Sequence, residues 1–389
     1  MVDTRAADRD SRHASLTLGL TLPVDVLLYL LLPMYAADFG VTLAEAGVLL
    51  AANRLVRIAG YGAVARFYSR HGDRLTCLLA TLATVFCALG LATVSGFWWL
   101  LPLRLVWGLA FAALNLSTQA LATAEPVGVA RRSGRSRAFI AVGPMVALVA
   151  GGLLAQVAGP RPIFWILAVV ALAGLLAARR LPATHHAPPP EARAGRRIRW
   201  PHALDAWSFM EGFTLDGLFI VGLSFLGKDL LPGGAVVVAG TLMALRYAAE
   251  IVLGPVGGRW AERVGPEPLL VGLSLATALA LVVFGAGGAG GWGGWGGWLW
   301  GGAACIVVLR ALQLPLMAPI VARRNPGAGR VQALAGRAIW RDIGAGTGPL
   351  VAGLLLPLLP SAWIYTVAAL LLAGAALACG RGAAPATAH

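Results

Sequence analysis

Apolar segments, each close to twenty residues long, recur along the whole chain and are separated by short polar stretches. About twenty consecutive apolar residues allow an α-helix to cross the hydrocarbon core of a bilayer. The predicted spans are 16–35, 44–65, 75–94, 97–121, 138–157, 162–178, 203–226, 236–257, 269–284, 300–321, 335–356 and 362–378. The pattern therefore predicts an all-α membrane protein with twelve transmembrane helices.

One central stretch departs from this pattern. Residues 179–202 are rich in proline and arginine and have no apolar periodicity. Such a segment cannot bury a core, so we expect a linker. It divides the chain into a six-helix half at 16–178 and a second at 203–379, with tails at 1–15 and 380–389.

A basic turn occurs in both halves, after the second and the eighth predicted span. When Gly72 is superposed on Gly265, the flanking positions fall in register. Arg70 then matches Arg263, Arg66 matches Arg259, Ala65 matches Gly258 and Arg57 matches Glu250. Aligning LDGLF of the seventh span with VDVLL of the first matches Asp216 with Asp25, and the distances from these aspartates to the basic turns differ by about two residues. Internal repeats of this kind are typical of secondary transporters.

Composition and charge narrow the class further. Hydrophobic residues make up 58% of the chain and charged residues 12%, whereas a soluble domain carries about a quarter charged residues. The net charge of +14 would favour a nucleic-acid partner in a soluble protein. Most basic residues, however, lie in the tails, the linker and the other even-numbered connections, while Arg161 and Lys228 lie in odd-numbered ones.

This charge bias follows the positive-inside rule. It predicts a multi-pass protein of the cell (inner) membrane with cytoplasmic N- and C-termini. The lipid bilayer is then its surroundings, and we expect no nucleic-acid partner. We also expect a monomer.

Enzyme chemistry is not expected. The sequence has no nucleophile–base arrangement, phosphate loop or ATP-binding motif. Its four cysteines are scattered without metal-ligand spacing, so free thiols are predicted. We therefore expect no cofactor and no metal.

The repeated turn, the span count and the central linker resemble the major facilitator superfamily. The turn typical of that family reads G-x-x-x-D-R-x-G-R-K. The second-half segment GGRWAERVG is close to it, with Gly258, Glu262, Arg263 and Gly265 at matching positions. The resemblance implies two pseudo-symmetric six-helix halves and a secondary transporter similar to bacterial exporters.

The first-half copy of the turn departs from the family pattern. Ala65 replaces the glycine, Ser69 replaces the acid, and Asp73 stands where a base is usual. Arg70 and Gly72 are retained.

Two further patterns support the resemblance. In span four, Arg104 is followed by Gly108 at the family's spacing. In span five, Gly-Pro at 143–144 and Gly-Gly at 151–152 approximate a pattern associated with antiporters, with a wider gap.

Charged residues inside the predicted spans are the candidate functional groups. An ionisable side chain at bilayer depth costs several kcal/mol, so it usually faces a cavity or a partner. The set is Asp25, Arg54, Arg57, Arg104, Asp216, Arg246, Glu250, Arg310, Arg341 and Asp342. Some of these groups could instead only pair with one another and hold helices together.

The resemblance implies that spans one, four, seven and ten line a central cavity, which would contain Asp25, Arg104, Asp216 and Arg310. The candidates for substrate binding or proton coupling are Asp25, Tyr29, Arg104, Asp216, Arg310, Glu250, Asn115, Gln119 and Gln313. The candidates for gating are Arg54, Arg57, Asp342, Arg341, Arg70, Gly72, Glu262, Arg263 and Gly265.

Depth in the membrane predicts one ion pair, and spacing along a helix suggests a second. The family's geometry packs spans two and eleven together, so we predict a pair between Asp342 and Arg57 or Arg54 that closes the inner side when the cavity faces outward. Glu250 has Arg246 as its nearest candidate partner, one turn away. Alternatively, an unpaired Glu250 could carry a proton.

Three functions remain open. The first is a proton-coupled exporter of a small organic solute, either drug-like or a zwitterionic metabolite such as a metallophore. The second is a proton-coupled uptake carrier for an organic anion, favoured by the cavity arginines. The third is a non-transporting membrane receptor or scaffold on the same fold.

Overall fold

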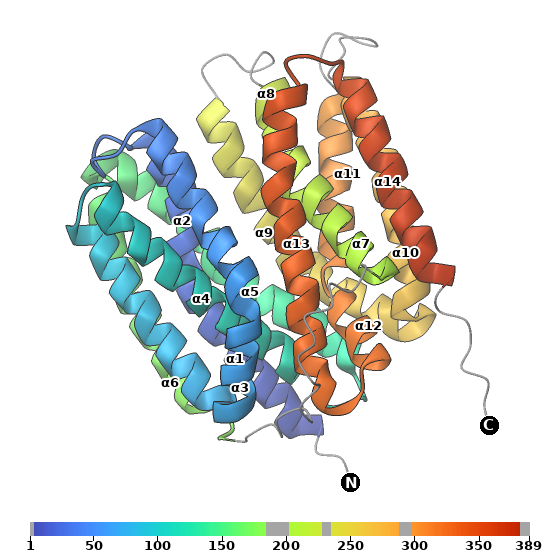
Figure 1. Ribbon diagram of the computed structural model, residues 1–389, viewed down its shortest axis with the longest axis horizontal. Coiled ribbons are helices and arrows are strands. Elements are labelled where there is room, and N and C mark those ends of the chain that lie inside the picture. The colour runs from blue at the N-terminus through green and yellow to red at the C-terminus, as the bar shows by residue number, and fades with distance from the viewer. Residues whose placement is uncertain (1–3, 184–201, 228–234, 288–296, 382–389) are drawn as a thin grey trace.

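The computed structural model describes residues 4–183, 202–227, 235–287 and 297–381. All regular secondary structure in these ranges is helical. The helices form two bundles side by side, and the start of α1 (Thr4–Thr21) and the end of α14 (Ser361–Arg381) point to the same end of the molecule (Figure 1). We call this the termini end.

The first half contains six helices. They are α1, α2 (Pro23–Met34), α3 (Leu43–Thr93), α4 (Phe97–Ala122), α5 (Val129–Ala158) and α6 (Arg161–Arg179). The second half is more broken. It contains α7 (Ala203–Glu211), the π-helix η1 (Gly212–Leu218), α8 (Phe219–Gly227), α9 (Ala235–Val264), α10 (Pro266–Gly287), α11 (Gly297–Gln313), α12 (Met317–Arg324), the 3₁₀-helix η2 (Gly327–Gly329), α13 (Arg330–Leu355) and α14.

Nine stretches of the described chain are long and apolar enough to cross a membrane. One of them, Ala44–Thr93, holds two spans that meet at a kink. Helices α9 and α13 are also long, but charges such as Glu250 and Asp342 lower their apolarity. With these counted, the described helices match the twelve predicted spans.

Two helices extend beyond the apolar segments that predict them. Helix α1 begins at Thr4, inside the segment 1–15 expected as a tail, and α5 begins well before Ala138. Ser15 is buried and donates a hydrogen bond to Ser136 over 2.7 Å, which ties α1 to α5. Apolarity marks only the part of a helix that lies in hydrocarbon, so polar turns at its end are not detected.

Three predicted spans are not single regular helices. The span at 16–35 consists of the end of α1 and of α2, the span at 203–226 of α7, η1 and α8, and the span at 300–321 of α11 and α12. The break between α11 and α12 contains Pro315, which lacks an N–H and cannot continue the helical hydrogen bonds. Most of the predicted linker lies outside the described residues, so the domain boundaries stay a prediction.

The two repeated turns share one backbone feature. Gly72 has φ 74° and Gly265 has φ 95°. A side chain is strained at such positive φ values, which explains glycine at both positions. Asp73, next to the first glycine, is fully buried, bonds to Tyr68 and accepts a 2.9 Å hydrogen bond from Ser117 of α4.

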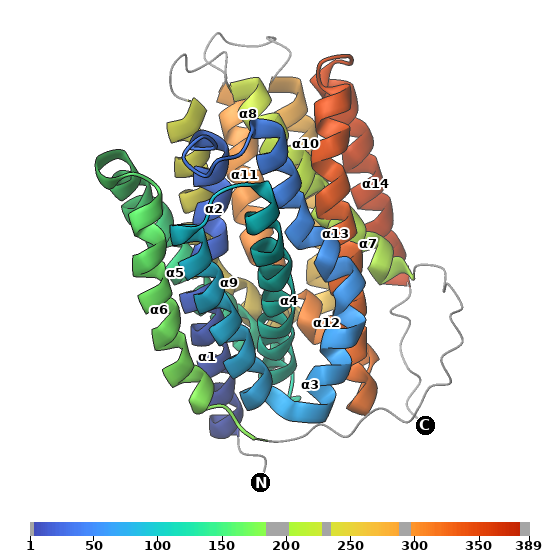
Figure 2. The ribbon, with the colours of Figure 1, turned by 60° about the vertical axis from the view of Figure 1, so that its left-hand side comes forward.

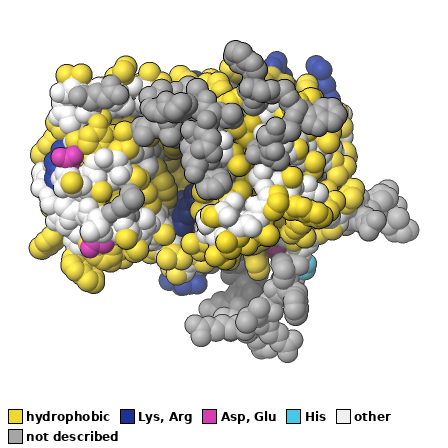
Figure 3. All heavy atoms as spheres, turned by 90° about the horizontal axis from the view of Figure 1, so that it is seen from above, with side chains coloured by type: hydrophobic (Ala, Val, Ile, Leu, Met, Phe, Trp, Pro, Cys, Tyr) yellow, Lys and Arg dark blue, Asp and Glu magenta, His cyan; other side chains and the backbone are white. Residues whose placement is uncertain are grey.

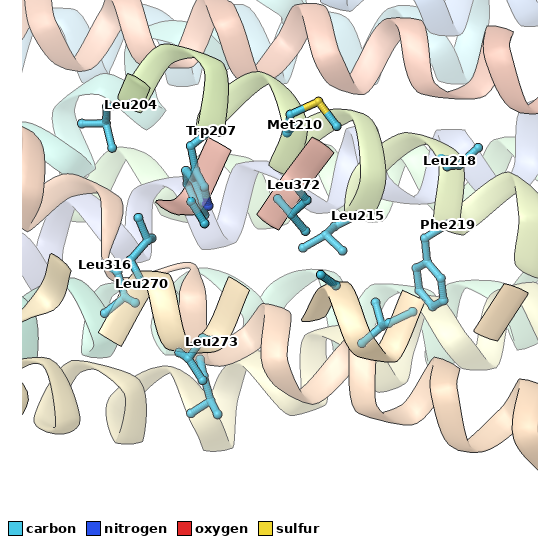
Figure 4. Packing of buried hydrophobic residues seen from close by; sticks show 14 of the residues in the cluster. Leu204, Trp207, Met210, Leu215, Leu218, Phe219, Leu270, Leu273, Leu316 and Leu372 are labelled. Atoms are coloured by element: carbon cyan, nitrogen blue, oxygen red, sulfur yellow. The ribbon is translucent and has the colours of Figure 1, made fainter. Parts of the chain in front are cut away.

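The molecule has two apolar cores, one within the first half and one centred on the second half that also takes in first-half residues such as Tyr61 and Leu116. In the second half, Leu204, Trp207, Leu215 and Phe219 from α7, η1 and α8 face side chains of α10 (Figure 4). The indole N–H of Trp207 donates to Ser274 over 2.9 Å, so the polar atom is satisfied inside that core.

The halves touch along α5–α9 and α3–α13 (Figure 2). A Cβ added to Gly134 of α5 would lie 2.4 Å from the carbonyl oxygen of Gly254 of α9, so the two backbones are in contact. Gly258, at the family's glycine position, likewise leaves no room beside Ala130. These contacts lie toward the termini end. From the opposite end, basic side chains are visible deep between the halves (Figure 3).

Candidate functional site

The first half contains one buried ion pair, which we call the N-half cluster: Asp25, Asn53 and Arg104. Arg104 of α4 pairs with Asp25 of α2, and the amide of Asn53 donates to both carboxylate oxygens over 3.0 and 3.1 Å. Arg104 also donates to the carbonyl of Leu49 over 3.0 Å and is only 2% exposed. The hydroxyl of Tyr29 donates to the Leu50 carbonyl over 2.9 Å. Besides Arg104, the carboxylate of Asp25 is therefore held by an uncharged amide, and the guanidinium of Arg104 is held by a backbone carbonyl.

The second half contains a larger network, the C-half cluster. It comprises three carboxylates and three guanidinium groups: Glu211, Asp216, Glu250, Arg246, Arg310 and Arg341. Asp216 lies 2.9 Å from Arg310, 3.3 Å from Arg246 and 2.5 Å from Arg341. Each arginine therefore contacts this one carboxylate.

The two other carboxylates complete the C-half cluster. Glu250 lies 2.5 Å from Arg310 and 3.7 Å from Arg246, and Glu211 lies 2.7 Å from Arg341. The predicted Arg246–Glu250 pair is confirmed, but the nearest partner of Glu250 is Arg310 of α11. Spacing along the sequence predicts contacts within one helix, such as Arg246 with Glu250, but it does not predict contacts between two helices.

The π-helix explains why Arg341 reaches two carboxylates. Glu211 ends α7 and Asp216 lies inside η1, five positions later. In a π-helix the hydrogen bonds join residues five apart, so such residues lie on nearly the same face. Both carboxylates consequently point to the guanidinium of Arg341 on α13. Single π turns within helices occur frequently at functional sites.

Exposure distinguishes the members of the C-half cluster. The side chains of Asp216, Glu250 and Arg310 are at most 8% exposed, whereas Arg246 is 22% and Arg341 34% exposed. The accessible face of the cluster is therefore made of guanidinium groups. Arg54 of α3 is half-buried and donates to the carbonyl of Ala345, with no ion pair among the described residues.

A separate ion pair joins the halves. Arg57 of α3 lies 3.1 Å from Asp342 of α13, and both side chains are nearly buried. The guanidinium carbon of Arg57 also lies 4.6 Å from the centre of the Phe111 ring, a cation–π distance. The predicted pairing of Asp342 with Arg57 is confirmed, and its role as a gate stays a prediction.

The two basic turns make different contacts with the opposite half. In the second turn, the carboxylate of Glu262 accepts the backbone N–H of Arg131 over 3.3 Å, at the N-terminal end of α5. That end of a helix carries partial positive charge and favours an anion. In the first turn the acid is replaced by Ser69, which is buried. Arg70 and Arg263 are exposed.

The sequence as a whole was then compared with known proteins. The model of the Major Facilitator Superfamily matches residues 15–233. The chain belongs to this superfamily. It is a multi-pass membrane protein of a transporter family, whose members work in lipid on small-molecule substrates.

Relatives and solved structures agree with this assignment. Two curated sequences from Mycobacterium tuberculosis strains, both described as an uncharacterised MFS-type transporter, are 26% identical over 265 residues. That match covers 60% of this chain and 61% of the relative. The crystal structure of the human organic anion transporter MFSD10 (TETRAN) superposes with a TM-score of 0.77 at 16% identity. It covers 97% of this chain and 100% of that one. At this identity the similarity shows the superfamily fold alone.

The remaining candidates on α4 and α11 are three amides: Asn115, Gln119 and Gln313. Asn115 is buried and Gln119 half-buried on α4. Gln313 is buried and donates to the hydroxyl of Thr277 over 2.5 Å and to the carbonyl of Leu273 over 3.3 Å, both on α10. These bonds hold α11 against α10 within the second core. Substrate contact by the three amides stays a prediction.

Three notable charged residues are absent from the predicted set: Glu211, Asp73 and Arg137. Glu211 lies inside the predicted span 203–226, so its position within a membrane span could have marked it as a candidate. Arg137 belongs to the predicted basic turn after span four, but the early start of α5 places it within a helix, where it is half-buried. Asp73 anchors the first turn to α4 and had no comparable sequence signal.

Proposed function

We propose that this chain is a secondary active transporter of a small organic solute that carries an anionic group. The observation that carries the proposal is the accessible face of the C-half cluster. Arg246 and Arg341 are half-buried and are its most accessible members, whereas the carboxylates are buried. Guanidinium groups bind carboxylate and phosphate in a bidentate fashion, so this face suits an anionic substrate.

Proton coupling follows from competition within the cluster. Glu211 and Asp216 both contact Arg341, so a substrate anion that binds Arg341 competes with them. Protonation of either carboxylate weakens its hold on the guanidinium. Proton binding and anion binding therefore favour each other, and this coupling is reciprocal. A carrier that moves both together is a symporter, which an inward proton gradient drives toward uptake.

Alternating access requires the termini end to open. The contacts that close it are the Arg57–Asp342 pair, the Glu262 bond to the α5 backbone and the glycine contacts between α5 and α9. Small residues allow these helices to part and close again without large side chains interlocking. We propose that substrate release at the termini end breaks all three sets of contacts.

The fold similarity to the human organic anion transporter agrees with an anionic substrate. At 16% identity it does not carry that proposal. The assignment of substrate class rests on the accessible arginines of this chain.

Proton-coupled export is the second candidate, supported by α5. A Cβ on Gly143 would lie 1.8 Å from the carbonyl oxygen of Gly19, so α5 packs directly on α1 at the segment that resembles the antiporter pattern. In this case a drug-like or zwitterionic solute with a cationic group would displace a proton from Asp216 or Glu250. Solute and proton would then move in opposite directions.

Placement in the membrane is part of the proposal. Basic residues cluster near the termini end, which supports cytoplasmic N- and C-termini in the bacterial inner membrane. A monomer suffices, since the cluster is built from helices of one chain.

The deciding experiment uses the purified full chain in liposomes that contain a pH-sensitive dye. A panel of anionic, zwitterionic and cationic solutes is added with and without a proton gradient. We expect anions to enter together with protons, and Asp216→Asn to abolish the proton signal. Asp25→Asn combined with Arg104→Gln is the matched control, because it removes the charges of the N-half cluster without leaving one unpaired, and its proton signal should persist.

Other outcomes decide between the candidates. Proton release from the lumen on entry of a cationic or zwitterionic solute would replace the symport proposal by antiport. Solute exchange without proton movement in the native chain would contradict proton coupling. No solute movement at all would favour a receptor or scaffold.

A further inference from the structure

A basic cavity lies at the termini end, on the membrane-facing side of the seam between the halves. It encloses about 610 Å³ and is lined by α1, α5 and α9, which lie together in Figure 2. Five arginines line it: Arg5, Arg9, Arg12, Arg132 and Arg135. The lining contains one carboxylate, Asp8, at 3.5 Å from Arg132 and 3.9 Å from Arg135.

Two arginines of α1 keep their positive charge for a ligand. Arg132 is buried and donates to the carbonyls of Ala122 and Val127 over 3.1 and 2.8 Å, so it serves the fold. The other four guanidinium groups are exposed. Asp8 contacts Arg132 and Arg135, and Asp10 lies 3.3 Å from Arg9, which leaves Arg5 and Arg12 without an acidic partner among the described residues.

The opposite wall of the cavity is apolar and continues along the membrane-facing side of α5. Phe139 and Val142 line the cavity. Exposed apolar side chains follow at helical spacing: Val146, Val149 and Leu153. Residues three or four apart lie on one face of a helix, so these side chains form one apolar stripe that starts at the basic cavity.

We propose that this cavity binds the headgroup of an anionic phospholipid from the leaflet at the termini end, with the acyl chains along the α5 stripe. Basic pockets between transmembrane helices suit anionic headgroups. A free phosphate ion would use the arginines but leave the apolar wall and most of the volume unoccupied. The basic lining of the cavity is continuous with the apolar stripe on α5, and this favours a lipid over a free anion.

The position of the cavity gives the lipid a conformational effect. Ile251 and Pro255 of α9 belong to the second half, whereas α1 and α5 belong to the first. Just beside the cavity, Gly134 and Gly254 bring the two backbones into contact. A ligand that touches both halves only when they are closed stabilises the closed termini end. The lipid is then a regulator of the conformational equilibrium and is not transported.

The test measures binding of a fluorescent phosphatidylglycerol to the full chain in detergent, with phosphatidylcholine as the neutral comparison. We expect phosphatidylglycerol to bind in preference. Arg5→Gln/Arg12→Gln should weaken its binding about 25-fold, since each basic residue near an anionic surface contributes about fivefold. Arg179→Gln/Arg323→Gln removes the same charge from exposed sites at the same end, outside the cavity. This control should bind like the native chain.

Three results would overturn the proposal. Equal weakening in both double variants would mean general attraction of lipid to a basic surface. Displacement of the lipid by inorganic phosphate at comparable concentration would mean an anion site without a role for the apolar wall. Equal binding of phosphatidylcholine would mean that the arginines do not select the headgroup. Matching thermal unfolding of both variants in phosphatidylcholine ensures that a loss of binding is not a loss of folding.

Discussion

The two halves carry the same type of ion pair in different surroundings. In each half, an aspartate of the first predicted span pairs with an arginine of the fourth: Asp25 with Arg104, and Asp216 with Arg310. In the register that superposes Gly72 on Gly265, Asn53 corresponds to Arg246. Asn53 holds its carboxylate with an uncharged amide, whereas Arg246 holds the equivalent carboxylate with a second positive charge.

This difference separates a structural pair from a switchable one. In the N-half cluster the arginine is buried and is fixed by a backbone carbonyl. The C-half cluster has several alternative partners for each charge and exposes Arg246 and Arg341. A network with interchangeable partners can lose or gain a proton or an anion without leaving a charge uncompensated. A single buried pair cannot.

The largest expected effect is on stability in the N-half cluster. Arg104→Gln leaves Asp25 buried without its charged partner, which should lower the free energy of unfolding by about 3–5 kcal/mol. Thermal unfolding in detergent measures it. Asp25→Asn combined with Arg104→Gln should recover much of the loss, because no charge is then left unpaired. A single variant as stable as the native chain would contradict a structural role for the pair.

The next largest effect is expected on transport, when a charge is removed from the C-half cluster. Asp216→Asn should reduce coupling between proton and solute by about tenfold or more, in the range typical of linked binding sites. Its effect on stability should be smaller than that of Arg104→Gln, because Arg310 keeps Glu250 and Arg341 keeps Glu211. Proton flux in liposomes and thermal unfolding measure the two effects. If Asp216→Asn and Arg104→Gln lowered the stability equally, the distinction between a structural N-half cluster and a switchable C-half cluster would be wrong.

A smaller effect is expected at the pair that joins the halves. Arg57→Gln should make the termini end open more often. The free-energy difference between the closed and the open form should shift toward the open form by about 1–2 kcal/mol. To detect this opening, Ser133, which is buried on α5, is replaced by cysteine in a chain that also carries Cys305→Ser. The rate at which a thiol reagent labels this cysteine then reports how often the termini end opens. The swap Arg57→Asp/Asp342→Arg should restore slow labelling. Fast labelling in the swap would show that the charges do not act as a pair.

The smallest effect concerns the repeated turns. Glu262→Gln removes the charge that meets the N-terminal end of α5 and should destabilise the closed form by about 0.3–1 kcal/mol. The same labelling assay should show about a two- to fivefold increase. Ser69→Ala, at the equivalent position of the first turn, should change labelling less. A larger effect at Ser69 would show that the first turn gates despite its missing acid.

The sequence predicted much of the architecture. Apolar length located the helices, and the superposition of Gly72 on Gly265 matched two positions that both have positive φ. The Arg57–Asp342 pair followed from equal depth on two spans that the superfamily packs together. These features depend on local periodicity and on position along the membrane normal, which a sequence contains directly.

The partners within the C-half cluster could not be predicted in the same way. Arg341 contacts Glu211 and Asp216 only because a π turn brings residues five apart to one face. Glu250 contacts Arg310 across two helices, although Arg246 is nearer in sequence. Rotation of one helix about its axis decides such contacts, and side-chain packing throughout the half decides the rotation.

The sequence by itself determined an all-α membrane protein, because the hydrophobic effect acts on local composition, and the described helices match its twelve predicted spans. Only the tertiary structure decided which buried charges are satisfied and which are accessible. Asp25 and Asp216 match along the sequence, yet one lies in a closed pair and the other in a network with exposed arginines. The difference arises because electrostatic energy depends on distances between helices, and these distances are set by packing.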